Sequence, residues 1–332
     1  MRRSVCALVL CVLWPTSPVA ADEPANLTVT GRRPAGDDDL SDWLRNAVQA
    51  HRYSPAETGL ALDLSEKEVS DACARLNIDP AAAYPAQNDG RLWILPYPGG
   101  RHPRIGFLEG AVDPQRETKF SVFTPWQPAD GLRADYVVAD IPEAIWSNLG
   151  LTYLAHTHVP TVWTKSGITL PVLEWTRHPH GILSLSRTLP NGIAFSSLVV
   201  PEHDHVAMRL TLTNGTDQAL TDLRVQNCVM LKAADGFNPQ TNDNKVSRAP
   251  YTAVRNAEGN RWILTAWKPN HRTWANDKCP CLHSDPKFPD CAPGETKTLR
   301  GWLSFYEGTD IEAEFDRIEA LNWWDDELPE AQ

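Results

Sequence analysis

Hydrophobic and polar residues alternate along the stretch from His205 to Leu231. A period of two places every second side chain on the same face of a strand, so one face is apolar and the other mostly polar. Asn214-Gly215 interrupts the alternation with residues that tolerate the positive φ of a turn. The pattern predicts a long antiparallel hairpin at the centre of a β-rich domain. Its apolar positions are Val206, Met208, Leu210, Leu212, Leu220, Leu223, Val225 and Val229.

Strand-like segments of this kind extend from residue 92 to residue 306. Turn residues such as Pro98-Gly99-Gly100 and Pro190-Asn191-Gly192 separate nearly all of them. Because no helical pattern comes between these segments, they predict a mostly β protein built as a large antiparallel β-sandwich over residues 85–308. The predicted strands are 92–97, 105–112, 119–126, 136–141, 149–163, 168–175, 182–189, 193–200, 206–214, 220–231, 252–255, 261–267 and 297–306.

Helical spacing occurs at the two ends of the chain. Residues 40–84 predict a small helical segment, in which Ser65 and Glu68 have the spacing of a capping box. Residues 309–332 predict a C-terminal helix and tail, with Thr309 and Glu312 as a second capping box. The apolar stripe of that last helix is Ile311, Phe315, Ile318 and Leu321.

The first 21 residues have the three parts of a secretory signal. They are the basic start Met1-Arg2-Arg3, an apolar run over 5–14, and the small residues Val19-Ala20-Ala21. We expect cleavage after Ala21, a flexible leader over 22–39, and a periplasmic or secreted protein. A membrane-spanning helix needs about 20 apolar residues. This run is about half as long, so no integral membrane association is expected.

Charge and composition limit the classes of molecule that this chain is expected to bind. The chain carries a formal net charge of −11, or −13 once Arg2 and Arg3 are removed. An acidic chain without a basic patch repels phosphate backbones, so nucleic acid is excluded as a partner. The 13 tryptophans are typical of packing, of stacking against sugar rings, or of both. The chain contains no Gly-x-Ser-x-Gly elbow, phosphate loop or dinucleotide fingerprint.

The central VAMRLTLTNGTDQALTDLRV sequence, preceded by many shorter strands, resembles the β-supersandwich of galactose-mutarotase-like domains. The same sandwich recurs in polysaccharide lyases and in some glycoside hydrolases. The resemblance covers residues 90–306 and implies a supersandwich-like fold and a carbohydrate partner. It rests on a generic hairpin and implies no particular catalytic residue.

Six of the ten histidines occur as His-x-His pairs, which project from one face of a strand. Such a pair can ligate one metal, or place an acid and a base beside one sugar. His156 and His158 lie in the middle of a predicted strand and are the favoured pair. The others are His178/His180 and His203/His205. The alternative interpretation is that these histidines occupy ordinary exposed strand positions without a function.

The segment 268–296 has no regular periodicity, and a loop of this length in a compact domain is usually functional or disordered. Its aromatic and polar residues favour a functional loop. Trp267 and Trp274 offer flat apolar faces suited to a pyranose ring, and the polar candidates for binding its hydroxyls are His271, His283 and Asp285. A structural loop held by disulfides is the alternative.

Five cysteines remain after the signal: Cys73, Cys228, Cys279, Cys281 and Cys291. In an oxidising compartment an odd number leaves at least one thiol unpaired. We expect Cys291 to pair with Cys279 or Cys281. Alternatively Cys279, Cys281, Cys291 and His283 hold a metal as three thiolates and an imidazole.

Arg104 and Glu109 lie in a third region, 93–117, that concentrates charge among strand-like residues. In a lyase, His156 or His158 would be the base and Arg104 would neutralise the uronate carboxylate. In a hydrolase or an epimerase, a carboxylate such as Glu109 would act with a histidine. Surface ion pairs are the alternative.

These observations favour an exported carbohydrate-active enzyme that acts on a glycan by acid–base chemistry. It would use His156, His158, Arg104 and Glu109 without a cofactor, or with a single divalent metal. A non-catalytic glycan-binding or surface protein is one alternative. A metal-dependent enzyme with His156 and His158 as ligands is another.

Overall fold

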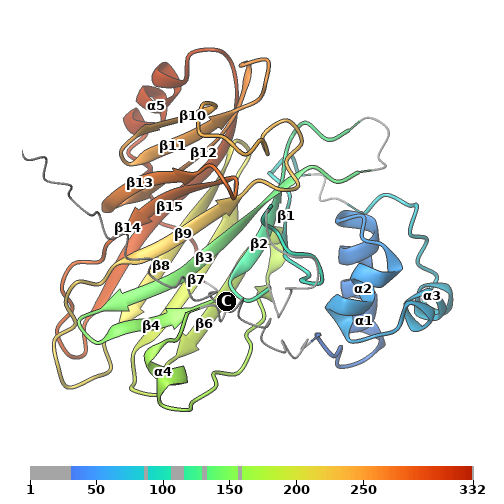
Figure 1. Cartoon of the computed structure of the whole chain (residues 1–332), viewed down its shortest axis with the longest axis horizontal. Coiled ribbons are helices and arrows are strands. Elements are labelled where there is room, and N and C mark those ends of the chain that lie inside the picture. The colour runs from blue at the N-terminus through green and yellow to red at the C-terminus, as the bar shows by residue number, and fades with distance from the viewer. Residues whose placement is uncertain (1–30, 86–88, 106–115, 129–132, 156–158, 331–332) are drawn as a thin grey trace, which may run out of the picture.

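Two antiparallel sheets stack face to face in the computed structural model, which describes residues 31–85, 89–105, 116–128, 133–155 and 159–330 (Figure 1). The first sheet has the strand order β1-β2-β3-β9-β14-β13, and β4 pairs with β3. Its strands are β1 (Ile94–Pro96), β2 (Lys119–Phe123), β3 (Tyr136–Ser147), β4 (Gly150–Leu154), β9 (Val225–Met230), β13 (Asn270–Asn276) and β14 (Cys281–Pro286).

The second sheet has the order β10-β11-β12-β15-β8-β7-β6-β5. Its strands are β5 (Thr176–Arg177), β6 (Leu183–Thr188), β7 (Ala194–Pro201), β8 (His205–Thr213), β10 (Lys245–Arg248), β11 (Tyr251–Arg255), β12 (Arg261–Lys268) and β15 (Thr296–Glu307). The predicted fold class, a large antiparallel β-sandwich with helices at both ends, is therefore confirmed.

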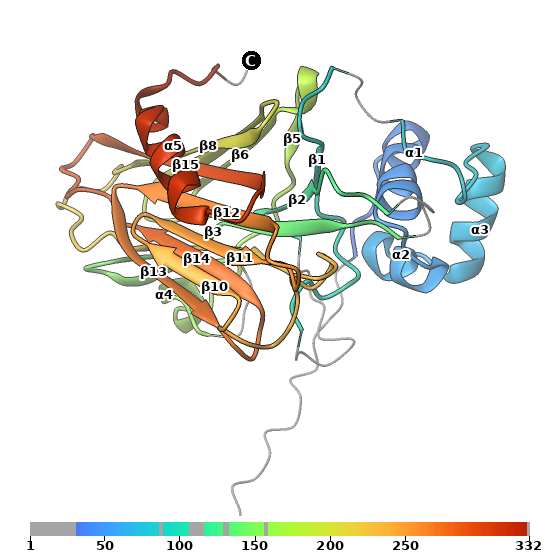
Figure 2. The ribbon, with the colours of Figure 1, turned by 90° about the horizontal axis from the view of Figure 1, so that it is seen from above.

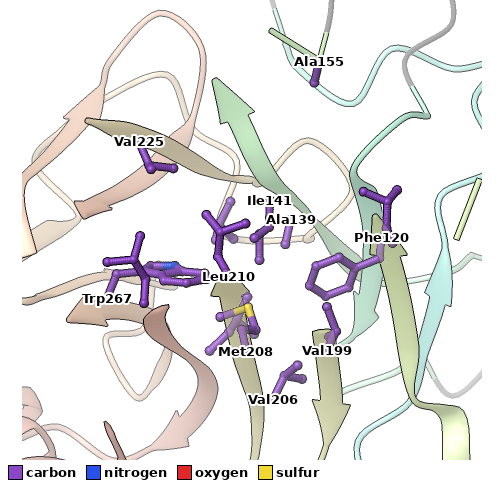
Figure 3. Packing of buried hydrophobic residues seen from close by; sticks show 14 of the residues in the cluster. Phe120, Ala139, Ile141, Ala155, Val199, Val206, Met208, Leu210, Val225 and Trp267 are labelled. Atoms are coloured by element: carbon purple, nitrogen blue, oxygen red, sulfur yellow. The ribbon is translucent and has the colours of Figure 1, made fainter. Parts of the chain in front are cut away.

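The main core fills the space between the sheets, because alternate residues of each strand point inward. β8 is the clearest case: Val206, Met208, Leu210 and Leu212 are buried, whereas the residues between them are partly exposed. Figure 3 shows Met208 and Leu210 beside Phe120 of β2 and Trp267 of β12. The apolar residues of the alternating pattern in the sequence thus form the inward face of the sandwich.

The N-terminal helices lie to one side of the sandwich, near β1 and β2 (Figures 1 and 2). They are α1 (Asp37–Leu44), its π-helical continuation η1 (Arg45–Ala50), α2 (Pro55–Leu62) and α3 (Glu66–Arg75). The predicted capping box at Ser65 and Glu68 opens α3. Where η1 ends, His51 reaches the first sheet and its Nε2 lies 2.7 Å from the Ser121 hydroxyl. The helices are therefore joined to the outer face of that sheet.

α5 (Ile311–Ala320) covers the outer face of the second sheet with its buried side chains Ile311, Phe315 and Ile318. Its N-cap is Asp310, whose carboxylate accepts a hydrogen bond from the Ala313 amide, and not the predicted Thr309. The remaining helical turns are α4 (Val162–Lys165), η2 (Pro179–Gly181) and η3 (Trp323–Asp325). No helix within the described residues is long and apolar enough to cross a membrane.

The predicted central hairpin is wrong in one respect. β8 pairs with β7 and β15 in the second sheet, whereas β9 pairs with β3 and β14 in the first. The two strands face each other across the core, since both need a covered apolar face. Alternation identifies that face but does not distinguish a hydrogen-bonded neighbour from a strand in the opposite sheet.

The segment predicted as a long loop, 268–296, instead contains β13 and β14, which extend the first sheet beyond β9. All six residues of β14 are buried, including the polar ones. A strand covered on both faces and carrying polar residues has no apolar alternation, which is why the sequence concealed it. The predicted strand over 168–175 is likewise absent from the described structure, and that over 149–163 ends at Leu154.

Candidate active site on the outer face of the first sheet

Ionisable side chains gather on the outer face of the first sheet, opposite the apolar core. Leu282 of β14 and Val229 of β9 point inward, so their neighbours point outward. The outward residues of β3, β9 and β14, with the start of β2 and the segment 102–104, form what we name the outer-face cluster. Its members are His102, Arg104, Lys119, Asp140, Glu143, Gln226, Cys228, Cys281 and His283.

Two ion pairs lie in this cluster. Lys119 Nζ is 2.8 Å from Asp140 Oδ2, and neither side chain has any exposed surface. Arg104 donates to Glu143, whose other carboxylate oxygen accepts from Gln226 Nε2 at 2.8 Å. Burial raises the pKa of Asp140 to about 6, although the Lys119 charge opposes it. Buried charges are costly even when paired, so a cluster of them is a candidate for function.

Beside these pairs lie two thiols and an imidazole. The ligand atoms of Cys228, Cys281 and His283 are all within 4.8 Å of one another, and all three residues are buried. Burial opposes the ionisation of Cys228, but the hydrogen bond from Cys281 and the positive charge of His283 outweigh it and lower the thiol pKa to about 5. Burial likewise opposes the charge on His283, yet the Cys228 thiolate and Asp285 raise its pKa to about 10.

The His283 ring is fixed by its neighbours. Its Nδ1 donates to the Asn227 carbonyl oxygen at 2.7 Å, which leaves Nε2 facing Cys281 Sγ at 3.1 Å. The Trp274 ring stacks on it with centroids 3.7 Å apart. Asp285 accepts from the Trp274 indole at 2.7 Å and from the Arg272 guanidinium at 2.8 Å. Three of the predicted site residues, Trp274, His283 and Asp285, are thus brought together as one stacked unit.

His102 and Lys232 continue the cluster toward the helices. Lys232 Nζ donates to the His102 carbonyl oxygen at 3.1 Å, and His102 Nδ1 accepts from the Arg104 amide at 3.1 Å. Burial and the charges of Arg104, Lys119 and Lys232 lower the pKa of His102 to about 3. His102 is therefore neutral at physiological pH. Lys232 also lines a cavity of about 270 Å³ together with His51, Arg52, Arg101 and Arg133.

A second cavity of about 490 Å³ lies where α1 meets the segment 172–177. Arg32, Arg116 and Arg177 line it, with the rings of Trp43 and Trp175. Among the described residues, no hydrogen-bond partner is found for the buried Nη1 of Arg116 or the buried Nη2 of Arg177. Residues 116–119 connect this cavity to the outer-face cluster, since the Lys119 amide donates to the Arg116 carbonyl at 3.0 Å.

The other predicted site residues lie apart or outside the described part of the chain. Trp267 is 1% exposed and packs in the main core against Gly301, so its ring has no face open to a sugar (Figure 3). His271 is exposed on β13 and belongs to no cluster that includes His283. His156, His158 and Glu109 fall at positions outside the described residues.

The predicted disulfide is absent from the described structure, where all five cysteines are free thiols. Cys291 bonds through its backbone to Leu220, and its thiol donates to the Glu295 carbonyl. Cys228 of the neighbouring strand approaches Cys281 instead. The expectation that Cys291 is the partner was wrong because the register of β9 and β14 brings together thiols that are far apart in the sequence.

Sequence reasoning missed Lys119, Asp140, Glu143 and Cys228. A signal for them was available, since Asp140 and Cys228 are polar or reactive residues inside predicted strands. A charge within an otherwise apolar strand costs stability unless it is paired. A charged residue inside an otherwise apolar strand therefore indicates a functional site as strongly as a His-x-His pair does.

No family model and no curated protein matches the chain. Solved structures do. One described as an aldose 1-epimerase from Escherichia coli K12 is 11% identical over 56% of this chain and 89% of its own, with a TM-score of 0.34. The heparan sulfate lyase HepC of Pedobacter heparinus is 7% identical over 73% of this chain and 40% of its own, with a TM-score of 0.31.

A structure described as a kojibiose phosphorylase from the human microbiome is 9% identical over 43% of this chain, with a TM-score of 0.28. The chain spans 20% of that protein's length. These neighbours include the mutarotase-like and lyase classes that the sequence resembles, at the level of fold alone.

Proposed function

We propose that the protein is an enzyme that acts on a carbohydrate by acid–base chemistry, with the outer-face cluster as its catalytic site. One observation carries the proposal: two buried ion pairs and a thiol–imidazole group share one face of one sheet. A buried ion pair is weak evidence for a role in stability, because its replacement by apolar residues of similar volume is often neutral in proteins. Grouped ionisable side chains with perturbed pKa values are typical of active sites.

In this proposal Glu143 transfers the proton and Arg104 stabilises the negative charge that develops on the substrate. Glu143 accepts from both Arg104 and Gln226, so its carboxylate is held in one orientation. A guanidinium beside the carboxylate can bind a uronate bidentately. His156, His158 and Glu109 remain predicted participants, with His156 and His158 also the predicted ligands of a divalent metal.

The substrate class that the surroundings favour is an acidic sugar. Several arginines line both cavities beside the cluster, together with carboxylates, and one cavity adds two tryptophan rings. In that cavity the buried Arg116 Nη1 and Arg177 Nη2 have no hydrogen-bond partner among the described residues. Arginines bind carboxylates and sulfates, and an indole ring stacks on the apolar face of a pyranose. The secretory signal predicted over residues 1–21 would place the enzyme in the periplasm or outside the cell, where such glycans occur as polymers.

The test uses the purified chain and a panel of uronate-bearing and neutral oligosaccharides. Ultraviolet absorbance detects an unsaturated uronate, reducing-end assays detect hydrolysis, and NMR detects epimerisation. For the substrate that reacts, Glu143→Gln should lower kcat/KM by about 100-fold or more, as expected for loss of a general acid or base. Glu330→Gln is the matched control, since Glu330 is 87% exposed and its ion pair within the described part of the chain is with Arg209.

Binding of oligosaccharides without any product would favour the non-catalytic alternative and refute the proposal. A Glu143→Gln variant that keeps the wild-type rate would refute the assigned role of Glu143. Thermal unfolding of each variant separates loss of chemistry from loss of structure.

A further inference from the structure

Cys228, Cys281 and His283 have the donor atoms and the spacing of a metal site. Their ligand atoms lie within 4.8 Å of one another, and Cys281 Sγ is 3.1 Å from His283 Nε2. In a tetrahedral zinc site, Zn–S bonds of about 2.3 Å and Zn–N bonds of about 2.0 Å put the ligand atoms roughly 3.4–3.8 Å apart. Small side-chain rotations therefore suffice to centre all three on one ion.

The backbone supplies this arrangement. Cys281 and His283 are two residues apart on β14, so both point to the outer face. The pairs Cys281–Met230 and Leu282–Val229 set the register of β14 against β9. Extended by one residue, this register would bring His283 opposite Cys228, in agreement with the short distances between their ligand atoms. A site built on two adjacent strands is held more rigidly than one built on a loop.

The residues around His283 orient its ring in the way that is common for metal-binding histidines. A metal-binding histidine commonly donates its other ring N–H to a carbonyl or a carboxylate. Here Nδ1 donates to the Asn227 carbonyl oxygen at 2.7 Å, with Asp285 Oδ1 at 3.7 Å, so Nε2, on the side of the thiols, is the ring nitrogen left to bind a metal. The Trp274 ring, 3.7 Å away and parallel within 9°, prevents the imidazole from turning.

We propose that Cys228, Cys281 and His283 bind one thiophilic divalent metal ion, with Zn²⁺ as the best match. Two thiolates and an imidazole are the donor set of a three-ligand zinc site that keeps its fourth position for water or substrate. Cys279, which is half-buried two residues before Cys281, is not a member of the three-residue group. The proposed ligands differ from the His156/His158 pair and do not depend on the proposed function.

The experiment titrates the reduced, chelator-treated full chain with Co²⁺, a spectroscopic substitute for Zn²⁺. We expect one Co²⁺ per chain, a thiolate-to-cobalt charge-transfer band in the near ultraviolet, and the visible bands of a tetrahedral site. Added Zn²⁺ should abolish these bands and raise the Tm. Cys228→Ser and Cys281→Ser should each lose the charge-transfer intensity. Cys291→Ser, which removes a buried thiol elsewhere, should keep it.

A folded, reduced wild-type chain that takes up neither Co²⁺ nor Zn²⁺ overturns the proposal, whatever the variants do. So does uptake that Cys228→Ser and Cys281→Ser leave unchanged. A Cys228–Cys281 disulfide in the isolated protein, together with no metal uptake after reduction, overturns it as well. Because metal binding is read without a substrate, its failure is distinguishable from failure of the proposed glycan chemistry.

Discussion

His51 makes the attachment of the helices to the first sheet sensitive to pH. Its Nδ1–H donates to the Asn46 carbonyl at 2.9 Å, so its Nε2 accepts from the Ser121 hydroxyl at 2.7 Å. Aromatic rings surround it edge-on, including those of Tyr136 and Phe123. Burial lowers the pKa of His51 to about 3, and the charges of nearby arginines act in the same direction.

Proton linkage gives the sign and the size of the pH dependence that His51 contributes to stability. The unfolded chain binds a proton at His51 near pH 6.5, whereas the folded chain does so only near pH 3. The stability that neutral His51 allows is therefore complete above pH 6.5 and is lost as the pH falls toward 3. Each pH unit well inside this window costs about 1 kcal/mol, so the loss between pH 7 and pH 4.5 is about 2–3 kcal/mol.

Urea unfolding of the wild type and of His51→Gln at pH 7 and pH 4.5 measures this cost. Glutamine keeps a polar, neutral side chain that does not titrate. Contributions from other groups, such as His102, are common to both proteins and cancel in the difference. We expect the variant to lose about 2–3 kcal/mol less than the wild type between pH 7 and pH 4.5. Equal losses in the two proteins would refute the reasoning.

Three further predictions concern the free energy of unfolding, measured with urea. Asp140→Asn leaves the buried Lys119 charge uncompensated and should lower this free energy by about 3–5 kcal/mol. The double variant Lys119→Met with Asp140→Leu should lower it clearly less, and equal losses would contradict the prediction. Gly301→Ala places a Cβ 2.5 Å from the Trp267 ring and should cost about 1–3 kcal/mol. Gly36→Ala has nothing within 4 Å and should cost only the poorer N-cap of α1, about 0.5 kcal/mol. Ser65→Ala removes the cap of α3 and should cost about 1 kcal/mol, unlike Ser70→Ala within the same helix; similar costs would argue against the capping box.

Periodicity was enough to predict the sandwich because one physical fact, burial of every second side chain, recurs along each strand. The four alternating residues of β8 all lie in the core. The caps of α2 and α3 are likewise local, so Ser65 and Glu68 could be recognised directly. The pairing partner of a strand is not local, which is why β8 and β9 were assigned to one hairpin.

The site was only partly predictable for the same reason. Trp274, His283 and Asp285 are close in sequence and lie together. Trp267 is nearly as close in sequence, but the inward face of β12 takes it into the core. The partners supplied by other strands, Cys228 and Glu143, depend on register, which no single stretch encodes.

β14 lies near the C-terminal end of the chain and is synthesised late, yet it pairs with one edge of β9 in the first sheet. While the protein is being synthesised, β9 therefore has an open edge until residues 281–286 have emerged, and such edges template aggregation. A chain truncated before β14 would keep that edge permanently and would lack both Cys281 and His283. Premature termination there should yield an insoluble product rather than a partly active one.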